Sequence, residues 1–98
     1  MAIPTYDRLL RPLLALATKQ EISRRSATDA MALAFGLSVD EREARIPSGA
    51  STYIANRTGW AMTFLTKAAL IEKVVRGTYR ITPAGHEFNS FPRRNSNC

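Results

Sequence analysis

The sequence predicts a mainly α-helical fold with one small β-hairpin, and two observations carry this prediction. Apolar residues recur at intervals of three and four along most of the chain, which is the spacing of amphipathic helices. Near the C-terminal end, two short runs rich in β-branched residues, 71–74 and 78–81, flank Arg76-Gly77, a pattern typical of a hairpin. The 98 residues suffice for one domain, which we place at 3–90. The predicted order is helix, helix, short helix, long helix, hairpin, helix, which is the plan of a winged helix-turn-helix.

The first predicted helix follows Pro4. Thr5 can cap this helix, and Asp7 suits the positive end of its dipole. Pro12 lies inside the apolar run and predicts either a kink or a later true start of the helix. The apolar face of this helix comprises Leu9, Leu10, Leu13, Leu14, Leu16 and Ala17.

The second helix is expected to start at a Ser cap. Residues 21–23 form a short isolated strand in this prediction, and Ser23 then caps a helix that continues through Phe35. Gly36 supplies the left-handed residue at which helices often end. The closely packing face of this helix comprises Ala27, Ala30, Met31 and Ala34.

The remaining elements also have start and stop signals. Residues 38–41 form a capping box that opens a short acidic helical turn, and 47–49 break it before the longest helix, 51–69. Thr82-Pro83 is a cap followed by proline at the first helical position, so a last helix begins there. We expect residues 91–98 to form a flexible polar tail.

The longest helix has two unlike faces. At 100° per residue, an apolar stripe forms the expected core face, and a polar stripe with a single cation lies opposite. A polar stripe suits a helix in the DNA major groove, where Asn pairs with adenine and the Thr methyl contacts thymine. An ordinary solvated helix face is the alternative interpretation. The core stripe comprises Ile54, Thr58, Ala61, Leu65, Ala68 and Ala69, and the polar stripe comprises Thr52, Asn56, Thr63 and Lys67.

Four larger side chains, Tyr53, Arg57, Trp60 and Phe64, lie between these two stripes. The three aromatic residues are at helical spacing, which favours a place in the core over stacking on a ligand. We expect Arg57 to extend into solvent and to contact a phosphate.

The positive charges lie where a winged helix would meet DNA. The formal net charge is +6, and it falls to +4 when Arg93 and Arg94 of the predicted tail are left out, so the domain itself is basic. Two arginines open the second helix, whose N-terminus already favours phosphate, and two lie on the hairpin. The predicted backbone contacts are Arg24, Arg25, Arg57, Lys67, Arg76 and Arg80, and the predicted base-edge residues are Thr52, Asn56 and Thr63, with Ser51 beside them. Asp40, Glu41 and Glu43 form an acidic patch that should face away from the duplex.

Catalytic and cofactor signals are missing. His86 is the one histidine and Cys98 the one cysteine, so one chain can form neither a zinc site nor a Cys-His pair. Gly49 and Gly59 belong to no phosphate-cradling loop, and we expect no cofactor and no enzymatic activity. A lone cysteine and the absence of a long apolar run predict a soluble, cytoplasmic protein with no membrane role.

Three groups of residues resemble one family. These are Pro47-Ser48-Gly49, the run Asn56-Arg57-x-Gly59-Trp60-Ala61 that continues to Ile71, and Arg76-Gly77-x-Tyr79-x-Ile81-Thr82-x-x-Gly85. Together with Ile3-Pro4-Thr5-Tyr6-Asp7 and Phe35-Gly36-Leu37, they resemble the N-terminal domain of Mrr-type restriction endonucleases. The resemblance implies a winged helix that binds DNA, attached in that family to a separate domain that cuts methylated DNA. That cutting domain is not expected in this chain.

Two functions therefore remain open. One is binding of double-stranded DNA, methylated or not, through the 51–69 helix with the Arg76-Gly77 wing on the backbone. The other is a protein-interaction winged helix that uses the same face for a homodimer or for a partner nuclease domain. Weak binding by a single small domain would make avidity in a larger assembly useful.

Overall fold

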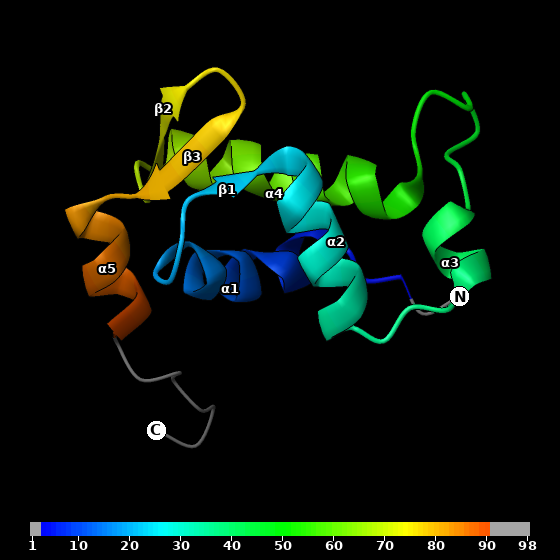
Figure 1. Ribbon diagram of the computed structural model, residues 1–98, viewed down its shortest axis with the longest axis horizontal. Coiled ribbons are helices and arrows are strands. Elements are labelled where there is room, and N and C mark those ends of the chain that lie inside the picture. Colours follow the sequence, from blue (N-terminus) through cyan, green and yellow to red (C-terminus); the bar gives the residue numbers. More distant parts are fainter. Residues whose placement is uncertain (1–2, 91–98) are drawn as a thin grey trace.

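The computed structural model describes residues 3–90, and Figure 1 shows the arrangement of their elements. The fold is mostly helical with a small antiparallel sheet, which confirms the predicted class and is compatible with a winged helix. The predicted tail, 91–98, lies outside the described residues. The elements are α1 (Tyr6–Ala17), β1 (Ile22–Ser23), α2 (Arg24–Ala34), α3 (Val39–Glu43), α4 (Tyr53–Lys67), β2 (Ile71–Val75), β3 (Thr78–Ile81) and α5 (Pro83–Ser90).

Helix α1 supplies much of the core. It runs continuously through Pro12, so the alternative of a later start is wrong. Thr5 occupies the N-cap position, but its hydroxyl accepts no backbone N–H; instead it donates to Asp7 Oδ1 at 2.5 Å. This hydrogen bond lowers the pKa of Asp7. The buried residues of α1 are Leu9, Leu13, Leu14 and Ala17, and the predicted Leu10 and Leu16 pack against the core while only half-buried.

Helix α2 starts and ends where its signals place it. The Ser26 amide donates to Ser23 Oγ at 3.1 Å and the Ser23 amide donates to Ser26 Oγ at 2.9 Å, a reciprocal cap. Gly36 follows the helix with φ 63°, as predicted. The packing face is shifted from the predicted one, because Ala32 is buried and Ala34 is exposed.

The predicted hairpin is part of a three-stranded sheet in the order β1-β3-β2, and we call this whole sheet the wing. The hairpin between β2 and β3 turns at Arg76-Gly77, where Gly77 has φ 77°, and this confirms the prediction. The short strand predicted at 21–23 is present as β1, but it is not isolated, because Ile22 pairs with Tyr79 and Ser23 with Thr78. Helix α2 is thereby attached directly to the wing.

Helix α4 is shorter than the predicted 51–69 helix. Thr52 caps its start, and the chain leaves the helix after Lys67 because Ala69 adopts a left-handed conformation with φ 63°. Ala68 and Ala69 are therefore exposed, and their assignment to the core was wrong. The helix packs on α1 and α2, and its buried residues are Ile54, Thr58, Gly59, Ala61, Met62 and Leu65.

The C-terminal helix α5 packs against β3 of the wing and against α1. The Gly85 amide donates to Thr82 Oγ1 at 3.0 Å, which confirms the predicted cap of α5. Gly85 lies so close to the backbone that a Cβ there would sit 2.0 Å from the Leu70 carbonyl oxygen. Within residues 3–90, no helix is long and apolar enough to cross a lipid bilayer.

Candidate nucleic-acid interface

Helix α4 lies across α1 and α2 and leads into the wing, so one of its long sides remains uncovered (Figure 1). Along this side is an open groove of about 530 Å³. We call it the polar groove. Among the described residues, its lining includes no aspartate or glutamate, and it brings together five of the predicted DNA-binding residues with three further residues. The lining residues are Arg24, Ser51, Ala55, Asn56, Gly59, Trp60, Thr63 and Lys67.

The polar side chains in and beside the groove differ in whether they already form hydrogen bonds within the domain. Thr52, a predicted base-edge residue, does not line the groove; its hydroxyl accepts from the Ala55 amide at 3.2 Å and caps α4. The Thr63 hydroxyl donates to the Gly59 carbonyl at 3.0 Å, and the Ser51 hydroxyl donates to the neighbouring carbonyl of Thr52 at 3.3 Å. Within residues 3–90 the side-chain amide of Asn56 makes no hydrogen bond, so its donors and acceptor are available to a ligand.

Arg24 reaches the groove because of a glycine on α4. It is the first residue of α2, and its guanidinium carbon lies 3.2 Å from the position that a Cβ on Gly59 would occupy. Gly59 is buried in α4, and its missing side chain leaves the space in which the Arg24 side chain crosses the helix. Gly59 was not singled out as a functional residue from the sequence, because only the crossing of α2 over α4 gives it this role.

Arg57 does not extend into solvent as predicted. Its Nη1 donates to the carbonyl oxygens of Ile3 and Pro4, at 3.1 and 3.4 Å, and its guanidinium lies 4.9 Å from the Tyr53 ring centroid. The side chain is half-buried on the flank of α4. Arg57 thus fixes the segment before α1, and it does not line the polar groove.

The wing arginines also differ from each other. Arg76 is exposed at the hairpin tip, as predicted. Arg80 forms a cross-strand ion pair with Glu72, with 2.8 Å between Nε and Oε2, so its charge is partly neutralised by the wing itself. Arg25 is exposed at the second position of α2, and the groove lining does not include it.

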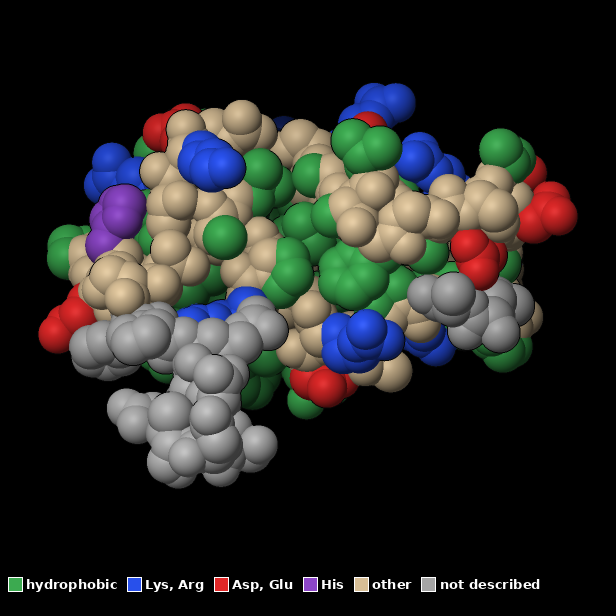
Figure 2. Space-filling model, turned by 90° about the horizontal axis from the view of Figure 1, so that it is seen from below, with side chains coloured by type: hydrophobic (Ala, Val, Ile, Leu, Met, Phe, Trp, Pro, Cys, Tyr) green, Lys and Arg blue, Asp and Glu red, His purple; other side chains and the backbone are tan. Residues whose placement is uncertain are grey.

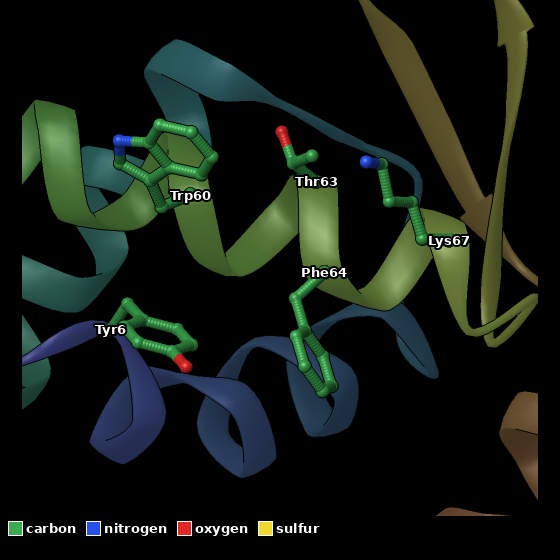
Figure 3. Close-up of a pocket in the computed structure, with 5 residues that line it drawn as sticks. All are labelled: Tyr6, Trp60, Thr63, Phe64 and Lys67. Carbon is green, nitrogen blue, oxygen red and sulfur yellow. The ribbon is translucent and has the colours of Figure 1, made fainter.

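A second hollow of about 350 Å³ lies between α4 and the start of α1, lined by Tyr6, Trp60, Thr63, Phe64 and Lys67 (Figure 3). We call it the aromatic pocket. Trp60 is 62 % exposed and Phe64 49 %, so the favoured interpretation of these two residues as core was wrong. Tyr53 packs partly buried against the core. Tyr6, whose ring centroid lies 6.2 Å from that of Phe64, could not be assigned to this pocket from helix periodicity, since it comes from another helix.

Comparison with known proteins identifies the family of this chain. The sequence pattern of the Mrr N-terminal domain matches residues 6–90. The chain belongs to this family. It is also 41 % identical, over 90 residues, to the type IV methyl-directed restriction enzyme EcoKMrr of Escherichia coli strain K12. The match covers 90 % of this chain and 29 % of that enzyme, and no solved structure matches the chain.

The charges of this Mrr N-terminal domain are unevenly distributed. In the view from below Figure 1, hydrophobic side chains gather at the middle of the face, and several acidic side chains lie at the end that carries α3 (Figure 2). Asp40 and Glu43 of α3 are exposed.

Over the described residues, no group of three or more His, Cys, Asp or Glu side chains is placed to hold a metal ion.

Proposed function

We propose that this domain binds double-stranded DNA, with α4 in the major groove and the wing along the sugar–phosphate backbone. The observation that carries this proposal is the polar groove: among the described residues, Asn56 presents an unbonded amide, two cations flank it, and no acid lines the groove. An unbonded Asn amide can pair with the N6 and N7 atoms of adenine. Arg24 and Lys67 would contact phosphates, which fix the position of the helix without reading sequence.

The proposed partner is modified DNA. EcoKMrr is described as a methyl-directed restriction enzyme, and the chain shares 41 % identity with it. A base methyl group in the major groove needs an apolar contact. Trp60 and Thr63 line the groove beside Asn56, and the Thr63 hydroxyl is already bonded to Gly59, which leaves the Thr63 methyl as its apolar contact surface.

Within a restriction system such a domain would direct cutting and not perform it. The match covers 29 % of the length of EcoKMrr, and the pattern of the Mrr N-terminal domain matches residues 6–90 of this chain. We propose that cleavage belongs to a separate nuclease domain and that joined copies supply avidity at the nucleoid.

Binding of the 98-residue chain to three matched duplexes, unmodified, adenine-methylated and cytosine-methylated, tests this proposal at two salt concentrations. We expect affinity to fall with salt, with a log–log slope of about −0.9 per phosphate contacted, and one methylated duplex to bind most tightly. Equal affinity for all three duplexes would reduce the function to unspecific DNA binding. No binding at low salt would contradict DNA binding altogether.

A protein-interaction domain is the second candidate, and the exposed Trp60 and Phe64 favour it. Such a face would join two copies of the chain or hold a nuclease domain. Salt separates the two candidates, because an apolar protein contact depends far less steeply on ionic strength than counterion release does.

A further inference from the structure

We propose that the aromatic pocket binds one nucleobase that has left the base stack of the DNA held on α4. This inference rests on the proposed DNA binding and adds a ligand to it. A base outside the stack exposes two π-faces, and base–aromatic stacking is the usual way in which proteins hold such a base.

The aromatic side chains of the pocket are exposed although the domain has a complete core nearby. Trp60, Phe64 and Tyr6 are 62 %, 49 % and 44 % exposed, whereas the neighbouring Ala61, Met62 and Leu65 of α4 are buried. Figure 3 shows Tyr6 below Trp60. Phe64 lies across the opening from these two residues, and Thr63 and Lys67 lie at the rim. The three aromatic side chains line one hollow of about 350 Å³, and their exposure leaves the rings accessible to a ligand.

The pocket adjoins the proposed DNA-reading surface. Trp60, Thr63 and Lys67 line both the aromatic pocket and the polar groove, so one side of each residue faces each hollow. A base that turned out of a duplex lying in the groove would therefore need no second binding surface to reach the pocket.

The charge of the pocket agrees with a nucleotide. Lys67 is its one charged lining residue among the described part of the chain, and no carboxylate faces the hollow. A nucleotide brings an aromatic ring together with a phosphate, so it satisfies both the rings and Lys67. An apolar segment of a protein would leave Lys67 without a partner of opposite charge.

The energetics of base extrusion give the test. Turning a base out of a duplex costs least where the base is mispaired, so a duplex with one central mismatch should bind more tightly than its matched counterpart. Trp60 is the single tryptophan of the chain and reports directly on stacking in the pocket. The experiment titrates the whole 98-residue chain with both duplexes and follows labelled-DNA anisotropy and tryptophan fluorescence.

We expect the mismatched duplex to bind about tenfold more tightly, because its mispaired base costs less to extrude, and to quench Trp60 more strongly at saturation. Phe64→Ala should abolish this difference and retain binding of the matched duplex, because Phe64 lines the aromatic pocket and not the polar groove. Leu33→Ala is the matched control: Leu33 is 74 % exposed on α2 and should change neither readout. Circular dichroism verifies that each variant is folded.

Salt-sensitive binding with equal affinity and equal quenching for both duplexes would overturn the pocket proposal and leave the proposed function intact. A mismatch preference that survives Phe64→Ala would also overturn it, since the preference would then come from the DNA alone. No binding of either duplex would refute the proposed function and this inference together.

Discussion

The two sides of α4 differ in what surrounds their arginines. On one side, Arg57 meets the carbonyl oxygens of Ile3 and Pro4 and becomes part of the fold. On the other side, Arg24 lies against Gly59 and borders an open groove whose lining, within residues 3–90, includes no acid. Both arginines lie near the same helix, so their roles differ because of their surroundings. The Arg57 guanidinium lies next to backbone carbonyl oxygens, whereas the Arg24 guanidinium lies next to an open groove. A cationic side chain can contact phosphate only where it is not already bonded to groups of its own domain.

Of the variants that separate Arg57 from Arg24, we expect Arg57→Ala to have the largest effect, a loss of stability. Loss of the charged hydrogen bonds and of the contact with Tyr53 should lower the free energy of unfolding by about 2–3 kcal/mol. Urea denaturation measures this change. The salt slope of DNA binding should stay as in the unmodified chain, and a shallower slope would mean that Arg57 contacts phosphate after all.

Asn56→Ala should act on binding and not on stability. Asn56 makes no side-chain hydrogen bond within residues 3–90, so the unfolding free energy should be unchanged. Affinity for the preferred duplex should fall by about 1–2 kcal/mol, the size of one base contact. Fluorescence anisotropy at fixed salt measures it, and equal losses on preferred and unrelated duplexes would argue against base reading.

Gly59→Ala sharpens the role assigned to Arg24. Alanine is the better helix former by about 1 kcal/mol, so the domain should be no less stable. The new Cβ would stand 3.2 Å from the Arg24 guanidinium carbon, so the end of the Arg24 side chain must shift by a few tenths of an ångström. This shift weakens the phosphate contact of Arg24 without removing it, so the salt slope should become shallower by less than about 0.9, the value for one phosphate contact. In an Arg24→Ala background, Gly59→Ala should have no further effect on the slope, and a full additional loss would refute this mechanism.

The smallest effect concerns the inner side of α4. The Thr58 hydroxyl is fully buried and has no hydrogen-bond partner among the described residues. Thr58→Val keeps the shape and removes the unpaired group, so thermal stability should rise by up to about 1 kcal/mol. A decrease would indicate a hydrogen bond of the hydroxyl in solution. DNA binding should not change.

Local chemistry explains how much of this domain the sequence predicts. The caps at Ser23 and Ser38, the turn at Gly77 and the start of α5 depend on neighbouring residues, and the structure confirms them. The pairing of Ile22 with Tyr79 depends on residues 57 positions apart along the chain, and no local pattern indicates it.

The site was less predictable for the same reason. Periodicity separates the faces of α4 and correctly places Asn56 on the uncovered one. It does not show that Arg57 lies beside free carbonyls, that Gly59 makes room for Arg24, or that Tyr6 completes a pocket with Phe64. Each of these is a contact between elements distant in sequence.

The most direct test of the account compares the salt dependence of duplex binding for the unmodified chain, the Arg24→Ala/Lys67→Ala double variant and Arg57→Lys. We expect the double variant to have a slope shallower by about 1.8, the value for two phosphate contacts, and Arg57→Lys to keep the original slope. An unchanged slope in the double variant, with the fold intact, would contradict the claim that the polar groove of α4 is the DNA-binding surface.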